Sequence, residues 1–176
     1  LSEKLGRPAT LDDVPDAELD SLKDLGFEWL YLLSIWQTGA AGQRVSRMND
    51  GWRKEFAETL SDLREEDIDG SGFAITHYTV HEKLGRDPAL GRFRKRASAR
   101  GLQLMLDFVP NHMALDHPWL ESHPDFFIQG NEEDLRNQPA NYTRLHTAAG
   151  QRVFAYGRDP YFSGWPDTLQ LNYANP

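Results

Sequence analysis

The chain contains no cysteine, so neither disulfide bridges nor thiolate zinc sites can form. It has no apolar run long enough to cross a membrane and no visible secretory signal, so we expect a cytoplasmic protein with no membrane partner. It also lacks a glycine-rich phosphate loop, a Gly-x-Ser-x-Gly turn and any His-x-Glu-x-x-His-like spacing. These absences argue against the enzyme classes that such motifs mark, including those with a catalytic transition metal.

The composition is that of an ordinary globular domain. The chain has 176 residues, of which 39% are apolar and 26% are charged, enough for one sizeable core. The formal net charge is -8. Basic residues gather only on one predicted helix, at Arg92, Arg94, Lys95, Arg96 and Arg100. We interpret this cluster as a solvated helix face and expect no nucleic-acid partner.

Two segments share the order helix, glycine, apolar strand. The first predicted helix ends at Gly26 and is followed by an apolar strand over Phe27–Ile35. The second has Asp87 as its N-cap, ends at Gly101 and is followed by a strand over residues 102–109. Repetition of this order is typical of α/β architecture with parallel strands that are buried on both faces.

Polar side chains cluster where the second strand ends. Asp107 lies within the apolar run, and Asn111 and His112 follow Pro110. Ligands of α/β proteins bind at the carboxyl ends of parallel strands, so the cluster is a candidate site for ligand hydroxyls or a cation. The alternative is a hydrogen-bonded strand end that only anchors a loop.

Two long segments follow the two strands. In the first, a loop is predicted at Thr38–Gln43, a helix capped by Asn49 or Asp50, and a further loop at His77–Val80. The second runs from residue 113 to the end and shows no sustained period, so we expect it to be irregular.

These segments carry most of the remaining candidate residues. Tyr78 can present its ring to a sugar or a base, or it can be a half-buried core residue. The other aromatic residues suit flat hydroxyl-bearing ligands, but we expect most to be packing; they are Trp36, Trp119, Phe126, Phe127, Tyr156, Tyr161, Phe162, Trp165 and Tyr173. His112, His117 and Asp116 have metal-binding side chains without a metal-site spacing, so we predict no transition metal there.

The run Asp107-Phe-Val-Pro-Asn-His112 resembles the first conserved region of the α-amylase family of glycoside hydrolases, whose pattern is Asp-x-Val-x-Asn-His. The approach Trp29–Trp36 is also similar, with Ser34 where the family has proline. Tyr78-Thr-Val resembles the family's tyrosine segment, and Leu171–Pro176 resembles a stretch late in its B domain. The resemblance covers most of the chain from Val14 onwards.

The resemblance implies a (β/α)₈ barrel with its active site on the C-terminal face, of which this chain would hold about two strands and a long irregular insertion. It divides the chain into barrel residues 1–112 and an insertion, residues 113–176. It also implies substrate-binding roles. Tyr78 would be the stacking platform for the sugar, His112 would bind its hydroxyls, Asp107 would brace the site, and Trp36 would lie beside them.

A calcium ion is the only cofactor that the resemblance raises. Many family members bind a structural calcium ion through the asparagine that matches Asn111. Gln170 stands where the family usually has an aspartate ligand of the same ion, and the lost charge weakens such a site. We therefore expect that the protein requires no cofactor, and we do not predict a bound calcium ion.

The family's reaction retains configuration and uses two carboxyl groups, both on later strands than those found here. A full barrel needs roughly 250 residues. We therefore expect a fragment of a longer enzyme that acts on α-glucosides, with an oligosaccharide substrate. The chain alone should be inactive, and either the rest of its own barrel or self-association should cover it. The alternatives are glucosyl transfer or isomerisation within the same family, and a non-catalytic carbohydrate-binding module.

Overall fold

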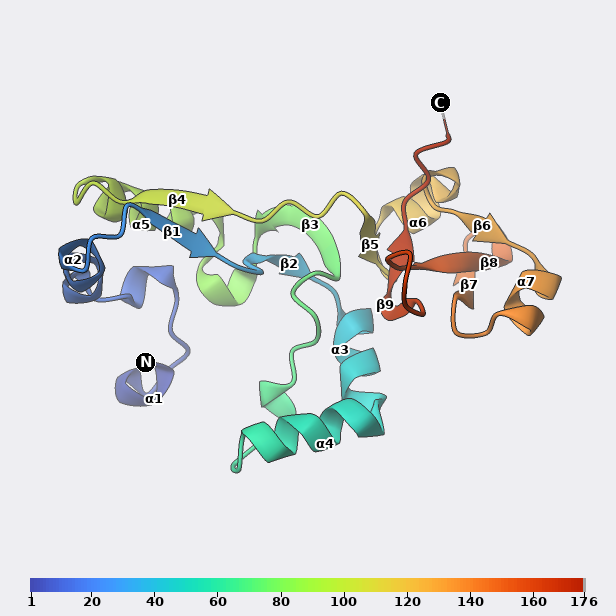
Figure 1. The fold of residues 1–176 in the computed structure, drawn as a ribbon, viewed down its shortest axis with the longest axis horizontal. Coiled ribbons are helices and arrows are strands. Elements are labelled where there is room, and N and C mark those ends of the chain that lie inside the picture. Colours follow the sequence, from blue (N-terminus) through green and yellow to red (C-terminus); the bar gives the residue numbers. More distant parts are fainter. Residues whose placement is uncertain (176) are drawn as a thin grey trace. The chain divides into compact units, whose positions relative to one another are not determined.

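The computed structural model describes residues 1–175, and Pro176, the last residue of the motif that begins at Leu171, lies outside the described residues. The protein is α/β and divides into two compact units, residues 1–37 with 78–108 and residues 38–77 with 109–176. Each unit is described by itself (Figure 1). The expected boundary between residues 112 and 113 concerns a barrel and its insertion, and it stays a prediction.

The first unit contains the two helix–strand segments that the sequence predicts. Its elements are α1 (Ser2–Leu5), η1 (Leu11–Asp13), α2 (Asp16–Asp24), β1 (Trp29–Leu32), η3 (Glu82–Leu84), α5 (Arg86–Ser98) and β4 (Gln103–Leu106). Strands β1 and β4 pair in parallel, from Trp29 opposite Gln103 to Leu32 opposite Leu106. Gly26 and Gly101 follow the two helices with φ of 88° and 72°, a backbone that suits glycine, so both predicted helix ends are confirmed.

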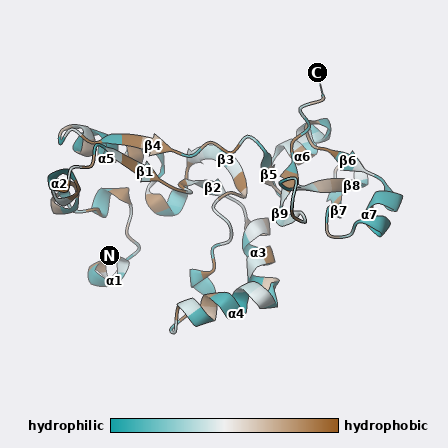
Figure 2. Ribbon diagram, viewed as in Figure 1, coloured by the Kyte–Doolittle hydropathy of each residue, from teal (hydrophilic) through white to brown (hydrophobic). Residues whose placement is uncertain are grey.

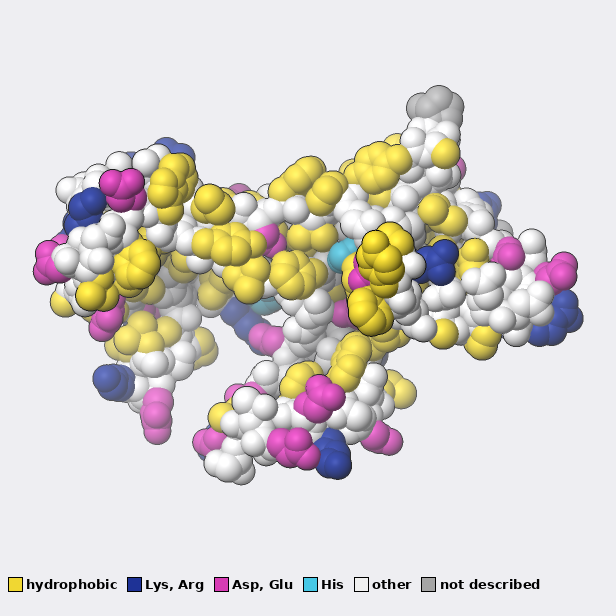
Figure 3. All heavy atoms as spheres, viewed as in Figure 1, with side chains coloured by type: hydrophobic (Ala, Val, Ile, Leu, Met, Phe, Trp, Pro, Cys, Tyr) yellow, Lys and Arg dark blue, Asp and Glu magenta, His cyan; other side chains and the backbone are white. Residues whose placement is uncertain are grey.

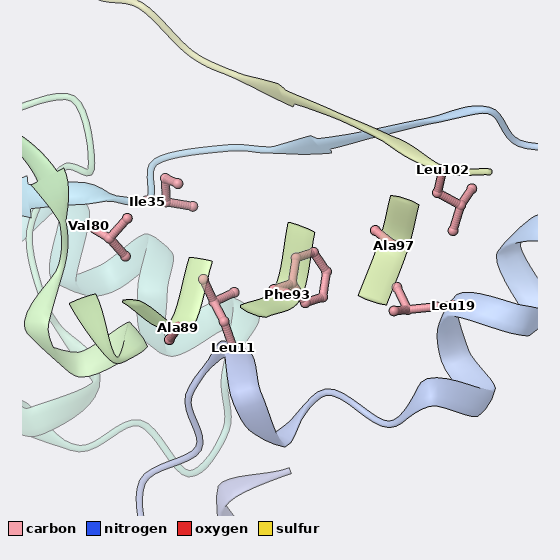
Figure 4. Packing of buried hydrophobic residues seen from close by; sticks show 8 residues of the cluster. All are labelled: Leu11, Leu19, Ile35, Val80, Ala89, Phe93, Ala97 and Leu102. Carbon is pink, nitrogen blue, oxygen red and sulfur yellow. The ribbon is translucent and has the colours of Figure 1, made fainter. Parts of the chain in front are cut away.

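Helix α5 supplies the centre of this unit's core. Ala89, Phe93 and Ala97 lie on successive turns of one helix face and are at most 3% exposed. Figure 4 shows them between Leu11 of η1, Leu19 of α2 and the residues that lead into or out of the strands. The small alanines allow the helix to lie close to its neighbours, and Phe93 fills the space between them. Asp87 is not the N-cap that we expected, because the helix begins at Arg86 and the Asp87 carboxylate accepts a hydrogen bond from the Val80 amide at 2.8 Å.

The strands of this unit are covered on one face only, so the prediction of strands buried on both faces is wrong for the described chain. The leucines of β1 and β4 pack against the core. The alternate residues Trp29, Tyr31 and Met105 are 50%, 54% and 50% exposed. Figure 3 shows hydrophobic side chains gathered on the surface over these strands. Because side chains alternate along a strand, this exposed face needs a second layer that the described residues of this unit do not provide.

The basic cluster lies on α5, as the helical prediction requires, and three of its arginines form ion pairs. Arg92 pairs with Asp12 at 2.6 Å, Arg96 with Asp16 at 2.7 Å and Arg100 with Asp20 at 2.5 Å. The arginines are spaced four residues apart along α5, and so are the aspartates along the N-terminal segment. Each turn of α5 therefore contributes one ion pair. Exposed pairs of this kind contribute little to stability, because water and salt screen them, and these three join the N-terminal segment to the surface of the helix.

The second unit is mainly an antiparallel sheet. Its elements are α3 (Ala40–Met48), α4 (Asp50–Thr59), η2 (Glu65–Asp67), β5 (His112–Ala114), α6 (Trp119–Ser122), η4 (Pro124–Phe126), β6 (Gln129–Gly130), α7 (Glu132–Asn137), β7 (Tyr142–Thr147), β8 (Gly150–Gly157) and β9 (Trp165–Gln170). The sheet has the order β5-β9-β8-β6, with β7 also paired to β8. In Figure 2, α4 and α7 are largely hydrophilic, in keeping with their lack of buried residues.

This sheet corrects the expectation of an irregular insertion. The hairpin of β7 and β8 turns at Ala148 and Ala149, which are not usual residues of a two-residue hairpin turn, and Gly150 follows them with a φ of 107°. Strand β9 pairs with β8 across a bulge at Tyr156 and Gly157, which breaks the two-residue period. The sheet is nevertheless well packed, since Phe127, Phe154 and Leu169 are at most 1% exposed.

Two further expectations need correction. The segment Thr38–Gln43, predicted as a loop, contains the start of helix α3. The segment His77–Val80, also predicted as a loop, belongs to strand β3 (Ile75–Val80), which pairs with β2 (Trp36–Thr38).

The cap of α4 is confirmed, since the Asn49 side chain accepts from the Trp52 amide at 3.0 Å. None of the helices within residues 1–175 has the length and apolar character needed to span a membrane.

Candidate functional site

In the first unit, Asp107 occupies the carboxyl end of β4 and holds the turn that follows β1. Its Oδ1 accepts a hydrogen bond from the Ser34 amide at 3.2 Å, and its backbone oxygen accepts one from Trp36 Nε1 at 2.9 Å. Ser34 has a φ of 58°, which is unusual for a residue other than glycine, and the bond to Asp107 stabilises this conformation. Asp107 therefore holds the turn at Ser34 through its side chain and Trp36 through its backbone oxygen.

The second oxygen of Asp107 is buried and has no hydrogen-bond partner among residues 1–175. A buried carboxylate oxygen without a donor costs free energy, because it loses its water and gains nothing in return. A donor from outside the described residues would supply the missing hydrogen bond to this oxygen.

An aromatic group lies beside Asp107. The edge of Trp36 meets Tyr78 with 5.2 Å between ring centroids, and Tyr78 lies 5.8 Å from Phe108. Tyr78 is 38% exposed and Phe108 is 75% exposed, so solvent reaches this pair. The structure thus brings together three of the predicted site residues, Trp36, Tyr78 and Asp107. Phe108 was not predicted, and its position directly after Asp107 was the only available signal.

The second unit contains the other two predicted residues, Asn111 and His112. His112 is 7% exposed, and its ring meets Trp165 edge-on at 5.2 Å. The Asn111 Nδ2 atom lies 3.1 Å from His112 Nδ1. Burial lowers the pKa of His112 below its usual value, and a hydrogen bond with the Phe73 backbone opposes this shift. His112 is therefore a neutral imidazole at pH 7, able both to donate and to accept a hydrogen bond.

Gly157 makes room for His112, and sequence reasoning missed it. A Cβ atom at this position would lie 2.7 Å from His112 Cβ and 2.6 Å from Thr168 Oγ1. The glycine sits at the β8 bulge, opposite Trp165. No glycine motif marks the position in the sequence, because the close approach comes from strands far apart in the chain.

Asn111 is held by Gln170, the last residue of β9. Gln170 Nε2 donates to the backbone oxygen of Asn111 at 2.8 Å and to its Oδ1 at 3.0 Å. Gln170 Oε1 accepts from the Arg158 amide at 3.1 Å and lies 3.4 Å from Asn111 Nδ2. The predicted calcium ligand is thus engaged in a network of neutral amides.

The side chains of Asp116 and His117, which could bind a metal ion together with His112, are each engaged in a hydrogen bond of their own. The Asp116 carboxylate accepts from the Ala41 amide at 2.9 Å, at the N-terminus of α3. His117 Nδ1 accepts from the Trp119 amide at 3.1 Å. Within residues 1–175, no three His, Cys, Asp or Glu side chains are arranged to hold a metal ion.

His117 predicts a pH dependence of stability. Burial lowers its pKa to about 4, with a further contribution from His77, whereas the unfolded value is about 6.5. Between these values the unfolded chain binds the extra proton, so the free energy of unfolding falls as pH falls. We expect a loss of at most about 2 kcal/mol from pH 6.5 to pH 5, at 1.36 kcal/mol per pH unit.

The measurement is the free energy of unfolding from denaturant titrations across this pH range. His112 acts in the same direction, and the buried Asp167, whose pKa is raised by burial, opposes both near the acidic end. His117→Asn should flatten the dependence, because an asparagine Oδ1 can still accept from the Trp119 amide without titrating. An unchanged slope in the variant would contradict the assignment to His117.

Comparison with known proteins gives consistent results. The family model described as alpha amylase, catalytic domain, matches residues 14–153. The alpha-1,4-glucan:maltose-1-phosphate maltosyltransferase of Cereibacter sphaeroides is 33% identical over 144 residues, which cover 77% of this chain and 20% of that protein. Maltase A1 of Drosophila melanogaster is 24% identical over 172 residues, 90% of this chain and 25% of that protein.

Among solved structures, an alpha-amylase from Lactobacillus plantarum has a similar fold. It superposes with a TM-score of 0.57 at 24% sequence identity, over 94% of this chain and 29% of that one. The chain covers only 20% and 25% of the length of the two curated relatives named above.

Proposed function

The chain belongs to the α-amylase catalytic-domain family of glycoside-active enzymes, and we propose on this basis that the intact protein cleaves α-glucosidic bonds. In this proposal the reaction retains configuration, with a carboxylate nucleophile and a carboxylic acid/base. Both groups come from parts of the enzyme beyond this chain. The residues described here bind and orient the sugar, and no cofactor takes part.

The observation that carries the proposal is the arrangement at the carboxyl end of β4. Asp107 holds Trp36 by its backbone oxygen at 2.9 Å, and Trp36 supports Tyr78 from the side at 5.2 Å. A partly exposed tyrosine with a fixed ring is suited to stacking on the flat apolar face of a glucosyl unit. At the same strand end, Asp107 Oδ2 has no hydrogen-bond donor among the described residues and could accept one from a sugar hydroxyl.

A partial barrel accounts for the open face of the first unit. In our proposal β1 and β4 are neighbouring strands of a (β/α)₈ barrel, with α2 and α5 in its outer layer. Trp29, Tyr31 and Met105, each at least 50% exposed, would then face the barrel interior. Residues 1–112 would belong to the barrel and residues 113–176 to an insertion.

His112 is the second substrate-binding group in this proposal. Its imidazole is neutral at pH 7, so one ring nitrogen can donate to a sugar hydroxyl and the other can accept. A neutral group also avoids repulsion of the positive charge that develops on the sugar in the transition state.

The test is hydrolysis of maltose and longer α-1,4-glucans by the intact protein, followed by chromatography, with NMR to identify the first-formed anomer. We expect cleavage with the α-anomer formed first. The isolated 176-residue chain should show no hydrolysis under the same conditions, because in our proposal both catalytic carboxyl groups lie outside it. Circular dichroism of the isolated chain is the control that checks whether it is folded. Hydrolysis by the folded isolated chain would contradict the proposed division of the active site.

A second candidate function is transfer of the sugar to another sugar. The observation that favours it is the 33% identity to a maltosyltransferase that uses α-1,4-glucan and maltose 1-phosphate. Incubation of the intact protein with both compounds would yield longer glucans if it transfers, and free maltose if it hydrolyses. Binding of glucan without either product would instead indicate a non-catalytic module.

A further inference from the structure

The pair Asn111 and Gln170 bears on the calcium ion that family resemblance implies. We propose that these two side chains form an amide clasp that takes the place of that ion, so that the second unit does not depend on calcium. The clasp consists of the Asn111 and Gln170 side chains and the backbone of Asn111. It joins the residue before β5 to the last residue of β9.

The hydrogen bonds between Gln170 and Asn111 run in the direction that opposes a cation. A calcium ion needs oxygen atoms that point at it, and Asn111 offers its backbone oxygen and its Oδ1. Gln170 Nε2 donates to both, at 2.8 Å and 3.0 Å. The positive end of an N–H group therefore occupies the position from which a cation would bind these two oxygens.

The Gln170 amide cannot flip without loss of hydrogen bonds. Its Oε1 accepts from the Arg158 amide at 3.1 Å and faces Asn111 Nδ2 at 3.4 Å. A flipped amide would place Oε1 against the two Asn111 oxygens and Nε2 against the Arg158 N–H group. The surrounding donors and acceptors thus select one orientation, and it is the one that excludes a cation.

The atoms around this pair differ from the usual ligands of calcium. Calcium is held by six to eight oxygen atoms at about 2.3–2.6 Å, usually with carboxylates among them. Every hydrogen-bond partner of the Asn111 and Gln170 side chains named here is a neutral amide, a backbone group or the His112 ring, including the Arg158 carbonyl at 3.4 Å from Asn111 Nδ2. The residues present do not fit a calcium ion.

The clasp lies within the strand pairing, which gives it a structural role. His112 and Gln170 are opposite each other in the β5–β9 pair, and the Leu171 amide donates to the same Asn111 backbone oxygen at 3.1 Å. The Asn111 oxygen is therefore saturated by two donors. Loss of the Gln170 side chain leaves partly buried acceptors unsatisfied and loosens the end of the sheet.

The experiment measures the unfolding temperature of the intact protein in excess EDTA and in millimolar calcium chloride. Gln170→Leu should lower it by roughly 5 °C in both conditions, because leucine loses the hydrogen bonds of the Gln170 amide to Asn111 and to the Arg158 amide. Gln170→Glu should lower it in EDTA, because a carboxylate oxygen replaces the donor that faces Asn111. Gln151→Leu is the control, an equal change at an exposed position of β8, and should leave the unfolding temperature within about a degree of wild type.

Two results would overturn the proposal. One is a Gln170→Leu variant that unfolds at the same temperature as the wild-type protein. The other is a rise in the wild-type unfolding temperature on addition of calcium that Asn111→Ala abolishes, since this would place the ion at the clasp.

Discussion

Replacement of His112 by alanine in the intact enzyme should lower kcat between ten- and a hundredfold, a loss of about 1.4–2.7 kcal/mol of transition-state stabilisation. In the proposed function the imidazole binds sugar hydroxyls, and these contacts strengthen as the sugar distorts towards the transition state. The ring is neutral at pH 7 because burial lowers its pKa. The measurement is initial rate against substrate concentration at pH 7.

Loss of structure must be separated from loss of function here, because His112 also packs against Trp165 at 5.2 Å. Rates are therefore normalised to the folded fraction, measured by circular dichroism. His146→Ala provides a control, since this histidine lies exposed on β7 and has no place in the proposed site. A kcat of the folded His112→Ala enzyme within twofold of wild type would remove His112 from substrate binding.

Substitution of Gly157 by alanine should destabilise the protein by about 3 kcal/mol, at the upper end of the usual cost of overpacking. The new Cβ would lie 2.6 Å from Thr168 Oγ1 and 2.7 Å from His112 Cβ, both on strands that pair in the same sheet. Neither atom is the free end of a flexible chain, because Thr168 is 2% exposed and Cβ is fixed to the backbone. The strands must therefore move apart.

The measurement is the free energy of unfolding from denaturant titration. Gly91→Ala is the matched control, because Gly91 is exposed within α5 and a Cβ there meets nothing within 4 Å. It should be neutral or stabilise the protein by up to about 1 kcal/mol, through better helix propensity. Equal effects of the two substitutions would refute the steric account of Gly157.

The parallel pairing of β1 and β4 and the ends of their helices could be predicted from the chain, because each depends on local signals. Gly26 and Gly101 mark the ends of the two helices because they take positive φ, and a short apolar run directly after such a glycine favours a strand. The antiparallel sheet of the second unit could not be predicted. Gly150 after the β7–β8 turn and Gly157 at the bulge are single glycines, and they do not show which strands pair with one another.

For the candidate site, the residues could be predicted from the sequence, but their surroundings could not. Tyr78, Asp107 and His112 are recognisable because their residue types and spacing match one family pattern. Their environments are decided by residues far away in the chain. Ser34 lies 73 positions from the Asp107 oxygen that it contacts, and Gln170 lies 59 positions from Asn111.

By itself, the sequence determined the family, the helix–strand segments and the residue types of the site, since these follow from short-range order and pattern. Only the tertiary structure decided which hydrogen bonds those residues make. It showed that Asp107 holds Trp36, that Gly157 admits His112 and that an amide donor faces the oxygens of Asn111. The reason is physical: a donor or acceptor is defined by its type in the sequence, but its partner is set by packing between strands distant along the chain.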